Sequence, residues 1–188
     1  KKLFALLTPP YMMVIAQNEN VDCKNSIKSD DTKDGMTLLS DPLKGTTARA
    51  SSVLEKNAVL YGAMNALDLS DSSTLWNSDH QSSNKRQIYQ INFNRTVDIR
   101  KLYIVFQGGF VGVDCELLLR KDEEAKFQKL EDAYVEPDDT NELQEFIIPD
   151  SGTQPICTAL RLSFGKSTDF YGRIMIYRFE VWGYEDPN

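Results

Sequence analysis

Short runs of alternating apolar and polar residues fill most of this chain, and the run at residues 173–183 is the most regular. Its odd-numbered apolar members are Met175, Tyr177, Phe179 and Val181. A period of two is typical of a β-strand with one buried face. Ile174 and Ile176 make the first half apolar on both sides. We therefore expect a closing strand that starts inside a two-layer β structure and ends nearer its edge.

Further runs of strand length precede this one, and turn signals separate them. They cover residues 89–93, 102–106, 115–119, 146–148 and 160–164. The one helical pattern, over 57–67, places Ala58, Met64 and Leu67 within helical reach of one another but is weakened by Gly62. Strand-length runs without a ten-residue helix predict an all-β antiparallel sandwich or barrel.

The first 47 residues differ in character from the rest. Residues 1–17 combine two lysines with an apolar run broken by Thr8-Pro9-Pro10. Residues 18–47 are polar, and only residues 36–39 among them are able to dock on a protein surface. The run is too short for a membrane span, which needs about 20 apolar residues. We expect an N-terminal extension over 1–47, with a retained apolar arm and a polar linker, and a domain over 48–185. A signal peptide cleaved after Ala16 is the alternative for the first residues.

The charge of the chain is concentrated in one segment. The formal net charge is −7, and residues 121–145, with three Lys and ten Asp or Glu, account for all of it. An acidic surface repels nucleic acid and anionic membranes, so neither is expected as a partner. The segment is either a solvated acidic loop or hairpin, or a contact patch for a basic partner.

The residue types that catalysis and metal binding require are sparse. His80 is the single histidine, and it follows an aspartate in a polar loop. Cys23, Cys115 and Cys157 are widely spaced and odd in number, which argues against a disulfide framework and favours a reducing compartment. No phosphate loop, dinucleotide fingerprint or zinc spacing is present in the sequence. We predict no enzyme, no cofactor and no metal.

Several motifs follow one another in a familiar order. A Ser-Ser pair at 51–52 leads to Thr74-x-Trp76-x-Ser78, and later come WNSD at 76–79, FQGGF at 106–110, LRLSF at 160–164 and TDFYGR at 168–173. Over residues 48–184 the chain resembles the discoidin, or coagulation-factor C-type, domains of the galactose-binding-like superfamily. More narrowly, it is similar to a family of small intracellular proteins associated with an orphan nuclear receptor. The resemblance implies a jelly-roll β-sandwich that binds other molecules.

Two features of the wider superfamily are a calcium site and a terminal disulfide. Some members hold calcium, and Asp68, Asp71, Thr74 and Glu180 occupy comparable places here. The intracellular relatives do not clearly need this ion, so we predict no metal. Extracellular members are often bracketed by a terminal disulfide, and no cysteine lies near the end of this domain. That difference argues against a secreted, lectin-like role.

The candidate site residues lie in loops. Trp76, between a turn and a polar loop, is expected to plug one end of the sandwich. Phe110, Phe170 and Tyr171 are aromatic residues on loops, where core packing does not account for them. Arg173 can donate to loop carbonyls, to Asp169 or to a ligand carboxylate. The predicted partner-binding residues are Gln107, Phe110, Asp169, Phe170, Tyr171 and Arg173.

These observations predict a non-enzymatic, intracellular module that binds protein partners, in the cytoplasm or nucleus by resemblance. The resemblance implies an accessory or regulatory partner of a nuclear receptor that restrains transcription. One alternative is a structural subunit of a large ciliary or organellar assembly, for example a mitochondrial one, anchored by its N-terminal arm. A second is a carbohydrate-binding module of a secretory compartment, which predicts cleavage after Ala16, a glycan on Asn94 and bound calcium.

Overall fold

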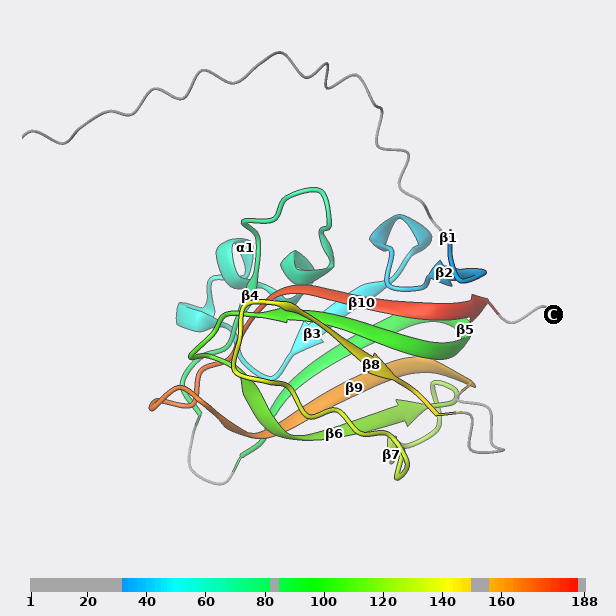
Figure 1. The fold of residues 1–188 in the computed structure, drawn as a ribbon. Helices are drawn as coiled ribbons and strands as arrows, with labels where there is room; N and C mark the ends of the chain where they lie inside the picture. Colours follow the sequence, from blue (N-terminus) through cyan, green and yellow to red (C-terminus); the bar gives the residue numbers. More distant parts are fainter. Residues whose placement is uncertain (1–31, 82–84, 150–155, 186–188) are drawn as a thin grey trace, which may run out of the picture. The chain divides into compact units, whose positions relative to one another are not determined.

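The structure, a computed structural model, describes residues 32–81, 85–149 and 156–185 (Figure 1). The strands are β1 (Thr32–Lys33), β2 (Met36–Leu38), β3 (Thr47–Ala50), β4 (Trp76–Asn77), β5 (Gln87–Phe106), β6 (Gly112–Arg120), β7 (Gln128–Lys129), β8 (Leu143–Ile147), β9 (Ile156–Ser167) and β10 (Met175–Glu185). Short helices are η1 (Pro42–Lys44), η2 (Leu54–Lys56), α1 (Ala58–Tyr61) and η3 (Ala63–Leu67). The all-β prediction is confirmed. Within the described residues, no helix has the length and apolarity that crossing a membrane requires.

The long strand β5 links the two layers of the sandwich (Figure 1). Its first part, residues 87–92, pairs with β3 and β9, and β9 pairs in turn with β6. Its second part, residues 97–106, pairs with β10, and residues 101–105 of it also pair with β8. Residues 97 and 98 still pair with the start of β9. A register shift after Asn92, next to the left-handed residue Asn94 (φ 56°), separates the two parts. All these pairs are antiparallel, so each layer presents alternate side chains to a shared core.

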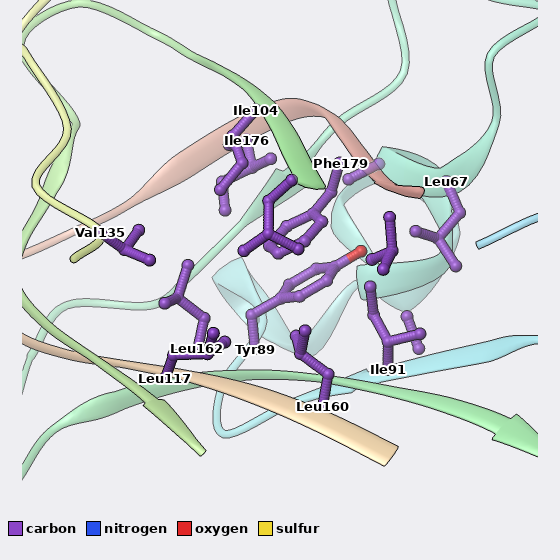
Figure 2. Packing of buried hydrophobic residues seen from close by; sticks show 14 of the residues in the cluster. Leu67, Tyr89, Ile91, Ile104, Leu117, Val135, Leu160, Leu162, Ile176 and Phe179 are labelled. Atoms are coloured by element: carbon purple, nitrogen blue, oxygen red, sulfur yellow. The ribbon is translucent and has the colours of Figure 1, made fainter. Parts of the chain in front are cut away.

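The core between the layers is formed by the side chains that sequence alternation predicts. Figure 2 shows Tyr89, Ile91, Leu160 and Leu162 facing Ile104 and Phe179 from the other layer. The hydroxyl of Tyr89 is buried and donates to the carbonyl oxygen of Ala63 at 2.7 Å. Burial raises the pKa of Tyr89 well above its usual value, so the phenol stays a donor. This bond ties η3 to the core.

The closing strand does not keep the single buried face that we predicted. The fully buried residues of this segment are Ile174, Ile176, Phe179 and Val181. A register shift between Ile176 and Arg178 inserts one residue into β10, which moves the buried face from even to odd positions. Met175 and Tyr177 are therefore half-buried, and the prediction is wrong for the first half of the strand.

The sheet begins before residue 48, where we placed the domain boundary. Strand β2 pairs with β10, and Leu39 is completely buried in the core. Residues 36–39 therefore belong to the sandwich. They are the part of the expected linker that was predicted to be able to dock. The expected arm over 1–17 lies outside the described residues.

The helical pattern over 57–67 is divided into two short pieces, α1 and η3. Gly62 lies between them with extended backbone dihedrals. A Cβ at this position would lie 2.3 Å from the carbonyl oxygen of Ala58, so a side chain here cannot be accommodated without a backbone shift. The break allows Ala66 and Leu67 to reach the core, because η3 turns toward β3 and β10.

Candidate functional site

The predicted site residues come together at one end of the sandwich, on two loops. The loop over 107–111 joins β5 to β6, and the loop over 168–174 joins β9 to β10. Backbone amides connect them: Thr168 donates to the oxygen of Val111 at 2.9 Å, and Met175 donates to the oxygen of Phe110 at 3.0 Å. We name residues 107–110 and 168–173 the loop-end surface.

Asp169 and Arg173 fix the shape of the second loop. The Asp169 carboxylate accepts from the backbone amides of Tyr171 and Arg173, each at 3.1 Å, and from the guanidinium of Arg173 at 3.2 and 3.4 Å. Burial alone would raise the pKa of Asp169, but the hydrogen bonds and charge of Arg173 outweigh it, so this pKa lies below its usual value. The hydrogen bond to Asp169 in turn raises the pKa of Arg173. The pair acts as a brace within the loop.

The aromatic side chains are arranged around this brace in two ways. The guanidinium of Arg173 lies 5.0 Å from the ring centre of Phe110 and 5.8 Å from that of Tyr171, within cation–π range. Phe110 is half-buried, whereas Phe170 is 93% exposed and Tyr171 is 64% exposed. The rings of Phe170 and Tyr171 meet edge to face at 5.2 Å. Phe110 therefore supports the loop, and the other two rings form its outer surface.

Gly172 permits this loop conformation. Its φ is +74°, and a Cβ there would lie 2.5 Å from the Cβ of Gln81. Gln81 also donates its backbone amide to the oxygen of Tyr171 at 3.0 Å. Only glycine combines the left-handed backbone with such a close approach, so the sequence Tyr171-Gly172 sets the direction in which the aromatic pair points.

A third loop, over 138–141, contributes to the site, and sequence analysis missed it. Asn141 Oδ1 accepts from the amide of Gly108 at 2.7 Å, and Asp139 Oδ1 accepts from the amide of Gly109 at 2.6 Å. In the sequence Asp139 and Asn141 belong to the acidic segment over 121–145. Two adjacent glycines expose their amides, and short Asn and Asp side chains are suitable acceptors, but nothing in the sequence pairs positions 30 residues apart.

Gln107 and Trp76 have internal partners. Gln107 Oε1 accepts from the hydroxyl of Tyr177 at 3.1 Å, so this side chain ties the first loop to β10. Trp76 is completely buried, with its ring centre 5.3 Å from Tyr89. Its Nε1 donates to the oxygen of Ser52 at 3.0 Å, which satisfies the polar edge of the indole.

The four residues that resemble a calcium set are not assembled into one site. Asp68 and Asp71 accept from the neighbouring Ser70 and Ser73. Glu180 is buried and accepts from Nε1 of Trp182 at 2.6 Å and from Arg178. Among the described residues, no three His, Cys, Asp or Glu side chains are grouped so that they could hold a metal ion.

His80 is exposed, whereas the described cysteines are half-buried (Cys115) and buried (Cys157). His80 is 71% exposed, and its Nδ1 lies 2.8 Å from the carboxylate of Asp79. Cys115 and Cys157 are free thiols, and burial raises the pKa of each to about 12. A thiol with such a pKa is a poor nucleophile at neutral pH.

Comparison with known proteins resolves the family. No family model matches the chain. The nuclear receptor 2C2-associated protein of Danio rerio is 36% identical over 141 residues, which cover 75% of this chain and 93% of the relative. The Mus musculus protein of the same name is 38% identical over 138 residues, covering 73% and 91%. The chain belongs to the nuclear receptor 2C2-associated protein family. The narrower resemblance stated from the sequence is thereby confirmed.

Solved structures identify the fold of this member of the nuclear receptor 2C2-associated protein family. A family 32 CBM from C. perfringens NanJ, solved with galactose, matches with a TM-score of 0.61 at 15% identity, over 78% of this chain and 98% of that one. The F5/8 type C domain of a Bacteroides fragilis protein gives 0.62 at 14% identity, over 74% and 92%. A chitosan-binding module from Paenibacillus sp. IK-5 gives 0.60 at 17%, over 78% and 98%. The discoidin-like, galactose-binding-like sandwich is confirmed.

Proposed function

We propose that this protein is a non-enzymatic protein-binding module that acts inside the cell as an accessory or regulatory partner. The loop-end surface is the contact site. The curated relatives of this protein carry the name nuclear receptor 2C2-associated protein, so nuclear receptor 2C2 is the first partner to test. The proposal includes the restraint of transcription that the family resemblance implied.

The observation that carries this proposal is the exposure of Phe170 and Tyr171 on a braced loop. Aromatic side chains dominate the energetics of protein interfaces, and each contributes roughly 150–250 Å² when fully buried. An exposed ring on a flexible loop loses conformational entropy on binding. Here Asp169 holds the loop with bonds to two amides and a guanidinium, so much of that cost is met on folding.

The predicted partner-binding residues separate into two roles under this proposal. Phe170 and Tyr171 contact the partner directly. Gln107, Phe110 and the pair Asp169 and Arg173 are positioning residues, because their polar atoms or ring faces already have partners within the protein.

Two other functions stay predictions. A structural subunit anchored by an N-terminal arm depends on residues 1–17, which lie outside the described residues. A carbohydrate-binding module has support from the fold of its structural neighbours, but the identities of 14–17% concern the fold alone. Each of them predicts a different experimental result, given below.

The test is a titration of nuclear receptor 2C2 into the purified full chain by isothermal titration calorimetry. The double variant Phe170→Ala/Tyr171→Ala should bind about 100-fold more weakly or not at all, because two interface aromatics together contribute a few kcal/mol. The matched control is Leu43→Ala/Val59→Ala, which removes two apolar side chains that are 97% and 86% exposed elsewhere. The control should bind like the wild type.

Equal losses in both double variants would contradict the loop-end site, because they would indicate non-specific apolar contact. Binding of galactose or chitotriose by the wild type, with no binding of the receptor, would favour the carbohydrate module. Isolation of the native chain in a large stable complex that lacks the receptor would favour the subunit.

A further inference from the structure

A second surface lies on the outer face of the layer formed by β3, β5, β9 and β6. In the strand register Arg49 is opposite Gln90, and Gln90 is opposite Arg161. Arg120 is opposite Ala159, two positions from Arg161 on the same strand, so it lies on the same face. Neighbouring strands are about 4.8 Å apart, so Arg161 lies about 10 Å from Arg49 across two strand spacings, and Arg120 lies on the next strand beyond Arg161. We name Arg49, Arg120 and Arg161 the arginine face.

An aromatic ring and an amide hold two of these guanidiniums in place. The guanidinium carbon of Arg161 lies 3.9 Å from the ring centre of Phe127, and that of Arg120 lies 5.4 Å from it. Gln90 Oε1 accepts from Arg161 at 2.8 and 3.3 Å. The packing and hydrogen bonds therefore fix the orientation of the charges before any ligand arrives.

These arginines lack carboxylate partners within the described residues. On the same face, Arg86 forms ion pairs with Asp114 and Glu116. In contrast, Arg49, Arg120 and Arg161 form no ion pair in the part of the chain that the structure describes, and Nε of Arg120 is buried without a hydrogen-bond partner there. Burial and the nearby charge of Arg120 lower the pKa of Arg161. Two like charges close together, neither in an ion pair with a described carboxylate, favour the binding of an anion nearby.

A cavity of about 350 Å³ lies between Arg49 and Arg120. Its lining includes Thr47, Asn92 and Asn94, whose hydroxyl and amide groups can donate to oxygen atoms. The lining is polar, so the site suits a charged, hydrogen-bonding group better than an apolar ligand.

The surroundings restrict the kind of anion. Glu123 and Glu124 border the same cavity, and the whole chain carries a formal charge of −7. An extended polyanion such as nucleic acid would meet this negative charge along its length. A short segment with a local cluster of negative groups would contact the arginines without extending over the negatively charged surroundings.

We propose that the arginine face binds a short acidic segment of a protein partner, through carboxylate or phosphate oxygens. This surface is separate from the loop-end surface: on β9, Arg161 precedes Ser167 by six positions, which corresponds to about 20 Å along a strand. A partner can therefore engage both surfaces, or two partners can bind at once.

The test is a set of NMR titrations of the isotope-labelled full chain in low salt. The probes are inorganic phosphate, a hexaglutamate peptide, and a serine-containing glycine-rich peptide with and without phosphate on the serine. The proposal expects shifts of the Nε–Hε signals of Arg49 and Arg120 and of the amides at 90–92 and 159–161. The double variant Arg49→Gln/Arg120→Gln should bind the preferred peptide at least about tenfold more weakly, since charge-assisted contacts are lost.

The matched control, Lys44→Gln/Lys166→Gln, removes the same charge from exposed positions outside this face and should keep wild-type affinity. Arg49→Glu alone should also abolish binding, and it tests the proposal if loss of Arg120 prevents folding. A preference for the phosphorylated peptide assigns the oxygens to phosphate, and equal binding of hexaglutamate assigns them to carboxylates. The proposal is overturned by equal weakening in both double variants, by the absence of these shifts with every probe, or by tighter binding of a single-stranded DNA oligonucleotide than of the peptides.

Discussion

The brace between Asp169 and Arg173 offers a quantitative test of the loop geometry. Asp169→Ala removes acceptors for two backbone amides and for the guanidinium of Arg173. Each hydrogen bond contributes about 0.5–1.5 kcal/mol net, and water can replace part of the loss because Arg173 is 31% exposed. We expect the free energy of unfolding to fall by about 2–3 kcal/mol. For a domain of this size that corresponds to a melting temperature about 5–10 °C lower.

Asp169→Asn should cost less, because the amide keeps one acceptor oxygen but loses the charge. The pKa of Asp169 is depressed in the folded protein, so the stability that its charge contributes is present above the unfolded pKa of about 3.9. It is lost as the pH falls through the lower folded pKa. Urea unfolding at a series of pH values should therefore show a constant difference between wild type and Asp169→Asn above about pH 5, shrinking in more acid solution.

The control for this series is Asp132→Asn, which removes the same charge from an exposed position without a hydrogen bond in the described structure. It should unfold like the wild type at neutral pH. The reasoning is refuted if Asp169→Ala costs no more than the control, or if the difference for Asp169→Asn stays constant down to pH 2.

Three further predictions concern the sandwich. Trp76→Ala should lower the free energy of unfolding by about 3–5 kcal/mol in urea titration, because the indole is completely buried. Gly112→Ala should cost about 1–3 kcal/mol in the same assay, since its Cβ would lie 2.2 Å from the ring of Phe164. With their pKa raised to about 12 by burial, the thiols of Cys115 and Cys157 should alkylate slowly at pH 8 in the native protein and rapidly in urea, as followed by peptide mass spectrometry. Fast native alkylation would contradict the burial.

The fold was predictable where one pattern had one interpretation. Tyr89, Ile91 and Phe93 alternate with polar residues, and a half-buried strand is the single structure that this period allows. The closing strand was harder, because its first half is apolar at every position. Ile174 and Ile176 fit the buried face as well as Met175 and Tyr177 do, and the inserted residue that decides between them leaves no mark in the sequence.

The candidate site was predictable in its local part and not in its long-range part. Asp169 and Arg173 are four residues apart in one loop, so their contact could be anticipated from the sequence. The support that Asn141 gives to Gly108 depends on how two distant loops meet. The same holds for the cation–π contact between Arg161 on β9 and Phe127, which precedes β7 and is far from Arg161 in the sequence.

Site-specific cross-linking tests the central claim most directly. A photoreactive phenylalanine analogue replaces Phe170 in one protein and Leu43, at 97% exposure, in a second. Each is irradiated with nuclear receptor 2C2 at a concentration where the complex forms. The account predicts a receptor adduct from position 170 and none from position 43. A complex that forms normally but gives an adduct at position 43, or none at position 170, would contradict the assignment of the loop-end surface.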